Sequence, residues 1–188
     1  DMSSDIFSRK IDLSKFDLIY AGAQKNLGPA GATMVIINKE LLKKVKRNVP
    51  SMLSYKIHIE KDSSFNTPPV FPIYCILLNL RLIKQEGIDI ISKKNKIKSE
   101  LIYSEIDRNR CFSGFSEVSD RSQMNATFNM NKGFDSELFN RICADYNISG
   151  INGHRSVGGY RASIYNALPL ESLYILIDAM KEFELSQE

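Results

Sequence analysis

The stretch between residues 16 and 38 constrains the fold most, because two apolar runs there flank a turn that is rich in glycine. The runs cover residues 17–21 and 32–37, and each has the length and composition of a buried strand. The turn between them holds three glycines, a proline and a single cation, Lys25. The stretch therefore predicts two strands of a mostly parallel sheet, buried on both faces, with a lysine where the first one ends.

A lysine in this position can act as a nucleophile. Strands and small side chains wall it in, and burial disfavours the charged ammonium, so that a desolvated lysine presents a free amine. Carbonyl cofactors require such an amine. An ordinary surface lysine in a loop is the alternative that the residues alone leave open.

A second cationic segment, residues 153–161, combines His154, Arg155 and Arg161 with three glycines. Guanidinium groups bind carboxylates and phosphates in a bidentate manner. Glycines let the backbone approach a ligand closely. The segment indicates an anion-binding turn, and a tight hairpin with surface arginines is its structural alternative.

Four separated motifs resemble the phosphoserine aminotransferase family, whose members are fold-type I enzymes that use pyridoxal 5'-phosphate (PLP). The motifs are Asp-Met-Ser-Ser at 1–4, Ala-Gly-Ala-Gln-Lys-Asn-Leu-Gly-Pro-Ala-Gly at 21–31, Phe-Asn-Thr-Pro-Pro at 65–69, and the segment at 153–170 that contains Gly-His-Arg-Ser-Val-Gly-Gly-Tyr-Arg. They occur in the family's order and span nearly the whole chain. The resemblance implies that the chain is the C-terminal half of such an enzyme.

The fold class implied by the resemblance is α/β, the C-terminal part of a fold-type I PLP-dependent transferase. Residues 1–85 are then the remnant of the PLP-binding large domain, which ends its mostly parallel sheet. Residues 86–188 form a small α+β domain.

The resemblance also implies the cofactor site. It makes Lys25 the Schiff-base lysine and Asp1 the partner of the pyridinium nitrogen, which keeps the ring electron-withdrawing. Gln24 is expected beside the ring. Asn66 and Thr67 are expected to reach the PLP phosphate of the partner subunit in a homodimer with shared active sites.

The implied reaction exchanges an amino group between O-phospho-L-serine plus 2-oxoglutarate and 3-phosphohydroxypyruvate plus L-glutamate, in serine biosynthesis. Arg161 is the expected partner of the substrate α-carboxylate, and His154 and Arg155 are expected to recognise the distal phosphate or carboxylate. Because the N-terminal half is not in the sequence, we expect this chain alone to be inactive.

Two alternatives remain open. One is a different fold-type I enzyme, such as another aminotransferase or a desulfurase. A desulfurase needs a reactive cysteine in a mobile loop, whereas Cys75 and Cys143 fall within predicted helices. The other is a non-catalytic module for anion binding or dimerisation, derived from half of an enzyme.

Hydrophobic periodicity predicts the remaining elements. Helices are expected over residues 39–45, 69–86, 88–108, 134–146 and 169–184, strands over 122–130, 148–151 and 160–165, and an irregular loop over 51–69. Thr67 is a candidate helix cap before Pro68, and His58 is expected to be an exposed loop residue. The helix over 88–108 should carry its lysines outside and bury a stripe made of Ile91, Ile97, Leu101, Ile102 and Ile106.

Composition excludes several classes of function. A net charge of +3 over 188 residues is too small to indicate nucleic-acid binding, and no apolar run reaches the roughly 18 residues of a membrane span. The three cysteines are widely spaced, which indicates neither a disulfide framework nor a metal site and suits the cytoplasm. Because the chain begins with Asp1, we expect that it has lost its native N-terminus.

Overall fold

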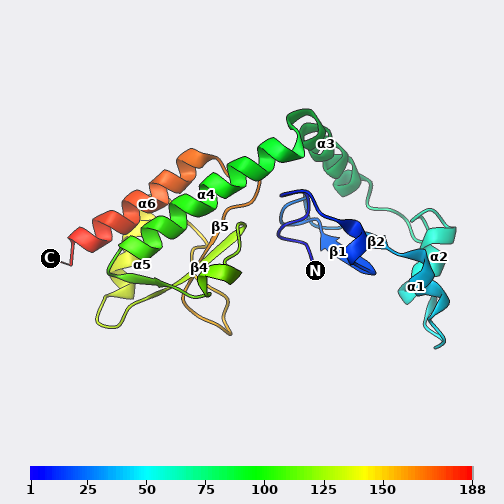
Figure 1. The fold of residues 1–188 in the computed structure, drawn as a ribbon, viewed down its shortest axis with the longest axis horizontal. Helices are drawn as coiled ribbons and strands as arrows, with labels where there is room; N and C mark the ends of the chain where they lie inside the picture. The colour runs from blue at the N-terminus through cyan, green and yellow to red at the C-terminus, as the bar shows by residue number, and fades with distance from the viewer. Residues whose placement is uncertain (188) are drawn as a thin grey trace. The chain divides into compact units, whose positions relative to one another are not determined.

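The computed structural model describes residues 1–187 and divides the chain into two compact units, Asp1–Ile88 and Asp89–Glu188 (Figure 1). Each unit has its own hydrophobic core and is described separately. Among the described residues, no helix is both long and apolar enough to cross a membrane.

The first unit contains the two strands expected around Lys25. Strand β1 (Leu18–Gly22) pairs with β2 (Thr33–Ile37) in an antiparallel register that aligns Leu18 with Ile37. The connection between them is too short for a parallel crossover, which explains the antiparallel direction. Ile19 and Ala21 of β1 are buried, whereas Tyr20 between them is exposed, so residues 1–187 cover one face of the pair and leave the other open to solvent.

Short helices and one long helix complete the first unit. They are η1 (Leu13–Lys15), α1 (Lys39–Lys43), η2 (Ser51–Leu53), α2 (Tyr55–Glu60) and α3 (Val70–Glu86). The expected irregular loop over 51–69 is therefore wrong in its first half, because a segment of about six residues is too short to show a clear helical period. His58 lies half-buried in α2, not exposed in a loop, and its ring packs against Phe65.

Helix α3 begins at Val70 after the extended residues of 66–69, so Thr67 does not cap it. Pro69 occupies the N-cap position, and no side chain caps the helix there. The core of the first unit is small and comprises Ile6, Ala21, Ala23 and Leu27, with Ile76 and Leu80 of α3 packed against it.

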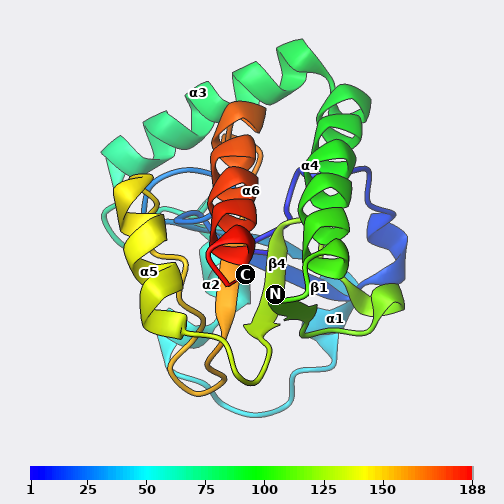
Figure 2. The ribbon, with the colours of Figure 1, turned by 90° about the vertical axis from the view of Figure 1, so that its left-hand side faces the viewer.

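The second unit is a three-stranded antiparallel sheet covered on one face by helices (Figure 2). Strands β3 (Phe112–Gly114), β4 (Asn125–Met130) and β5 (Tyr160–Ser163) lie in the order β3-β4-β5. Helices α4 (Ile88–Arg108), α5 (Ser136–Asp145) and α6 (Leu170–Leu185) form the layer, with α6 between α5 and α4. A short helix, η3 (Val118–Asp120), precedes β4.

Aromatic side chains dominate the core between sheet and helices. The ring of Phe112 lies 4.9 Å from that of Phe139 and 5.7 Å from that of Phe183. Phe128 stacks on Tyr160 at 5.4 Å. These contacts join β3 to α5 and α6 and fix β5 beside β4.

Two expectations for this unit are wrong. Residues 148–151 form no strand, and the isolated bridge between Asn152 and Tyr160 begins just after them. The buried stripe of α4 includes Asn95 and Lys98, whereas Ile97 is 49% exposed. Ser99 and Glu105 are buried as well, and hydropathy cannot identify a stripe in which four buried positions are polar or charged.

Candidate functional site

Lys25 lies in a turn that continues β1 and returns to β2, here called the lysine turn (residues 23–32). The amide of Ala23 donates to the carbonyl of Ala32 at 3.0 Å, which extends the strand ladder by one pair. The amides of Leu27 and Gly28 both donate to the carbonyl of Ala23, at 3.3 and 2.7 Å. Leu27 is fully buried and anchors this helical turn, whereas Lys25 is exposed.

The N-terminal segment lies along β1 and the lysine turn. The amide of Met2 donates to the carbonyl of Tyr20 at 2.8 Å. Buried Asn26 bonds to the same segment twice, through its amide to Ser3 O at 3.3 Å and through Nδ2 to Ile6 O at 2.7 Å. The first six residues are thereby fixed next to Lys25.

Two consecutive serines bind the two residues: Ser3 bonds to Asp1, and Ser4 bonds to Lys25. Asp1 Oδ1 accepts hydrogen bonds from the amide of Ser3 at 2.8 Å and from its hydroxyl at 2.6 Å, and that hydroxyl accepts from the amide of Gly22 at 2.9 Å. Lys25 Nζ donates to Ser4 Oγ at 3.2 Å. A carboxylate and a primary amine thus lie at the same end of the strand pair.

Gln24 belongs to the same group of residues. A side chain at Gly22 would place its Cβ 2.5 Å from Gln24 Oε1, so the Gln24 amide lies over the Gly22 backbone. The structure therefore brings together Asp1, Gln24 and Lys25. It does not bury Lys25 as the sequence predicts, because the apolar residue of the turn, Leu27, faces the core instead.

Asn66 and Thr67 do not share hydrogen bonds with this group among the described residues. Both are exposed in the extended segment before α3, where Asn66 Nδ2 donates to Thr67 O at 3.3 Å. Within residues 1–187, no hydrogen bond links either side chain to the lysine turn. Their role toward the cofactor stays a prediction.

The second cationic segment forms a compact turn, here called the glycine turn (residues 153–159). The carbonyl of His154 accepts from the amides of Val157 and Gly158 at 2.9 and 2.8 Å, and the amide of Gly153 donates to Gly159 O at 2.8 Å. A Cβ at Gly153 would overlap the carbonyl oxygen of Gly158, and Gly158 has a φ of +76°. The turn therefore requires these glycines.

His154 uses one ring nitrogen within the turn. Its Nδ1 lies 2.7 Å from Ser156 Oγ and accepts from the Ser156 amide at 3.2 Å. In the neutral imidazole this leaves the proton on Nε2, which can donate to a ligand.

Arg161 and His154 line the same hollow, which has a volume of about 360 Å³. Arg161 lies on β5 opposite Thr127 of β4, and its amide donates to Ile151 O at 2.7 Å. Its Nε atom is buried and has no hydrogen-bond partner within the described chain. Arg155 is exposed and does not line this hollow.

Several residues of these two sites have no role that follows from the sequence alone. Ser4, which bonds Lys25, gave no signal beyond its place in the first motif. Asn125, Thr127 and Asn129 line the hollow together with Arg161. The sequence indicates them only through the alternation of polar and apolar residues along β4, because the polar face of a half-buried strand points away from the core.

A cationic hollow and an amine beside a carboxylate suit the chemistry of amino and oxo acids. Arginine binds their carboxylates, and a lysine amine reacts with carbonyls. Residues 1–187 contain no group of three or more His, Cys, Asp or Glu side chains that could hold a metal ion.

Comparison with known proteins agrees with this chemistry. The family described as aminotransferase class-V matches residues 1–176. The chain is 60% identical to the phosphoserine aminotransferase of Flavobacterium psychrophilum and 54% identical to that of Azobacteroides pseudotrichonymphae, with 98% of the chain aligned in each case. The chain spans about half the length of these curated relatives, 52% in both.

Solved structures give the same result for the fold. The phosphoserine aminotransferase of Bacillus circulans subsp. alkalophilus matches with a TM-score of 0.94 at 42% identity, over 100% of this chain and 53% of that one. A PLP-bound phosphoserine aminotransferase from Trichomonas vaginalis matches with a TM-score of 0.89 at 37% identity, over 96% and 52%. The expected fold, half of a fold-type I transferase, is confirmed.

Proposed function

The chain belongs to the class-V aminotransferase family, and from this premise we propose that it is the C-terminal half of a phosphoserine aminotransferase. The complete enzyme would exchange the amino group between O-phospho-L-serine and 2-oxoglutarate, giving 3-phosphohydroxypyruvate and L-glutamate. The observation that carries the proposal is the 60% identity to a protein of that name over 98% of the chain. Serine biosynthesis is the corresponding role.

The residues around the lysine turn fit PLP. Lys25 offers a primary amine whose only hydrogen bond within residues 1–187 is to Ser4 Oγ, at 3.2 Å. Asp1 offers a carboxylate that two hydrogen bonds from Ser3 hold in place. When bound, PLP supplies an aldehyde carbon that condenses with amines and a ring that withdraws electrons from the substrate.

Each of these residues has a separate task in the proposal. Lys25 would hold the cofactor through Nζ, and its free amine would take up and hand on the proton that leaves the substrate Cα. Asp1 keeps the ring nitrogen protonated, because its carboxylate pairs with that proton. Gln24, whose amide lies over Gly22, would contact the cofactor.

Arg161 is the proposed partner of the substrate α-carboxylate. Its buried Nε, unpaired among the described residues, supports this role, because a guanidinium edge that binds an anion is expected to be free beforehand. His154 lines the same hollow and would bind the distal phosphate or carboxylate through Nε2. Arg155 would contribute charge from outside the hollow.

We also propose a homodimer in which Asn66 and Thr67 bind the PLP phosphate of the partner subunit. The exposed apolar side chains next to this segment support it, since Val70 and Phe71 at the start of α3 are 71% and 70% exposed.

The three cysteines are unpaired, which supports a reducing compartment such as the cytoplasm.

A desulfurase is poorly supported. That reaction needs a thiolate, and burial raises the pKa of Cys143 to about 11 and also raises the pKa of Cys111. Cys75 lies within α3 and not in a loop.

Borohydride reduction tests the assignment of the cofactor lysine. The protein that carries this chain together with the N-terminal half found in its relatives is reduced, digested and mapped. We expect the pyridoxyl group on the Lys25 peptide, no label in a Lys25→Ala variant, and an unchanged label in the matched control Lys39→Ala. A label on another lysine of the wild type, or transamination that survives Lys25→Ala, contradicts the proposal.

A further inference from the structure

One face of α3 packs directly against the lysine turn. Pro72, Ile76 and Asn79 are spaced four and three residues apart, which places them on the same side of the helix. A Cβ added at Gly28 would lie 3.0 Å from Ile76 Cγ1, and one added at Gly31 would lie 3.0 Å from Pro72 Cγ. Glycine at these positions allows the turn and the helix to approach closely.

Asn79 is the polar member of this face. Its Nδ2 donates to the carbonyl of Leu27 at 2.8 Å and lies 3.5 Å from the carbonyl of Asn26. Both carbonyls belong to the last residues of the helical turn that presents Lys25. The carbonyls at the end of a helical turn lack partners within that turn, so a donor from elsewhere stabilises them.

The surroundings of this contact make it specific. Leu27 is 0% exposed and Asn26 is 5% exposed, so their backbone is not free to bond water. Asn79 is half-buried in a helix whose other residues from 70 to 80 are apolar or proline. An asparagine in such a helix has a cost that its hydrogen bonds offset.

We propose that Asn79 is a positioning residue for Lys25: it fixes the backbone of the lysine turn through the carbonyls of Leu27 and Asn26, and thereby the place from which the Lys25 side chain extends. The proposal rests on the cofactor role of Lys25. The four-carbon side chain of lysine has many conformers, so its reach depends on a fixed backbone. Loosening the turn should impair proton movement by Lys25 more than binding of the amino-acid substrate.

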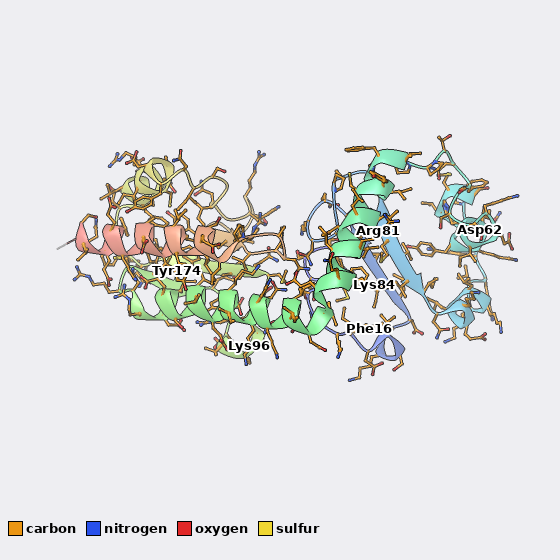
Figure 3. All side chains as sticks on the ribbon, turned by 90° about the horizontal axis from the view of Figure 1, so that it is seen from above. Phe16, Asp62, Arg81, Lys84, Lys96 and Tyr174 are labelled. Carbon is orange, nitrogen blue, oxygen red and sulfur yellow. The ribbon has the colours of Figure 1, made fainter. Side chains whose placement is uncertain are left out.

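The first test needs no cofactor. In the apo form of the complete protein, hydrogen exchange is measured at the amides of Leu27 and Gly28, which donate to Ala23 O. We expect Asn79→Leu to speed their exchange at least tenfold and Asn79→Gln, which keeps an amide donor, to stay within about threefold. The control is Arg81→Leu, an exposed position two residues further on α3 (Figure 3), which should leave both rates unchanged.

The second test uses the PLP-loaded protein. Asn79→Leu should lower kcat by roughly tenfold, with KM for phosphoserine within twofold, and should shift the pH midpoint of the cofactor absorbance. Asn79→Asp, which keeps the shape and removes the donor, gives the same comparison if the leucine variant does not fold. The proposal is overturned if amide exchange at Leu27 and Gly28 is unchanged in both Asn79→Leu and Asn79→Asp. It is also overturned if these variants lower the melting temperature but leave kcat and the cofactor spectrum unchanged.

The proposed function can fail separately. A wild-type protein that takes up no PLP at Lys25, yet shows fast exchange at Leu27 and Gly28 in the Asn79 variants, would keep Asn79 as the support of the turn and refute the cofactor role of Lys25.

Discussion

Lys98 should stabilise the second unit in a way that depends on pH. Its side chain is 3% exposed, and its Nζ donates to the carbonyls of Ile164, Tyr165 and Leu168 at 3.1, 2.7 and 3.3 Å. These carbonyls belong to the connection between β5, which carries Arg161, and α6. Burial, together with the charge of nearby Lys94, lowers the pKa of Lys98 to about 8.

At neutral pH the Lys98→Met variant should lose about 2–4 kcal/mol of unfolding free energy. One of the three carbonyls is bonded in a buried environment and two are partly buried. An unsatisfied buried group costs about 1–3 kcal/mol, and the partly buried ones cost less. Removing the desolvated ammonium returns some of this loss, because its pKa is depressed in the folded state.

The sign of the pH dependence follows from the lowered pKa. Between about pH 8 and the ordinary value of 10.5, the unfolded chain holds the Lys98 proton and the folded chain does not. Stability rises with pH wherever the unfolded state binds more protons. The wild type should therefore gain about 1.5 kcal/mol relative to Lys98→Met between pH 8 and 9.5. Well below pH 8 both states hold the proton, so the difference between the two proteins should no longer change with pH.

Urea denaturation of residues 86–188, followed by circular dichroism from pH 7 to 9.5, measures both effects. The second unit has its own core of twenty buried residues, so we expect this segment to fold. Lys96→Met is the matched control, because Lys96 lies on the outside of the same helix and its side chain is 64% exposed (Figure 3). If Lys98→Met is as stable as Lys96→Met at pH 7, or if their difference does not change with pH, the reasoning fails.

Three further outcomes are expected. Arg161→Leu in the complete enzyme should lower kcat/KM by roughly tenfold to a few hundredfold with little change in melting temperature, because one charge-assisted contact is lost; a variant that unfolds or keeps normal kinetics contradicts this. Mixing a Lys25→Ala protein with an Asn66→Ala/Thr67→Ala protein should restore activity after subunit exchange, since one site per heterodimer is intact; proven exchange without recovery counts against shared sites. The isolated 188-residue chain should show no transaminase turnover, and its amides in residues 1–85 should exchange faster than those in 86–188; turnover at an ordinary enzymatic rate would refute the half-enzyme proposal.

Local patterns were sufficient to predict the lysine turn. The two apolar runs and the glycines between them specify strand, turn and strand, and the structure contains β1 and β2 at these positions. The burial of Lys25 was wrong because burial depends on residues far away in sequence. Its backbone lies in a well-packed turn, but the Lys25 residue itself is exposed.

Periodicity predicted the long helices and failed for short segments. Helix α4 was predicted with both of its bounds, Ile88 and Arg108, because a long helix repeats its pattern many times. Helix α2 has six residues, and residues 148–151 are apolar without pairing as a strand. In such short segments the outcome depends on tertiary contacts that local propensity does not contain.

The residues whose roles the sequence did not reveal are mainly polar residues on helices. The face of a helix was assigned by its apolar residues, so Asn79 was overlooked and Lys98 was placed on the outside. Both side chains are recognisable only when their backbone partners are known, and those partners lie 52 residues or more away in sequence. The candidate site residues themselves came from motif resemblance, which does not reveal what supports them.

Asn79 and Lys98 both stabilise backbone carbonyls of a segment next to a candidate site, one with an amide and the other with an ammonium group. Each site-bearing segment has backbone carbonyls without a partner in a helix or strand, so each gains from a donor that binds them from outside. Asn79 supports the lysine turn with a neutral amide, whereas Lys98 supports the end of β5 with an ammonium that has three N–H donors for three carbonyls. Above about pH 8 the neutral amine of Lys98 keeps only two donors, so one carbonyl loses its partner. Relief of the buried charge outweighs that loss, because the lowered pKa of Lys98 means that deprotonation favours the folded state. Asn79 does not titrate, so alkaline pH should change the stability of the second unit while leaving the lysine turn unchanged.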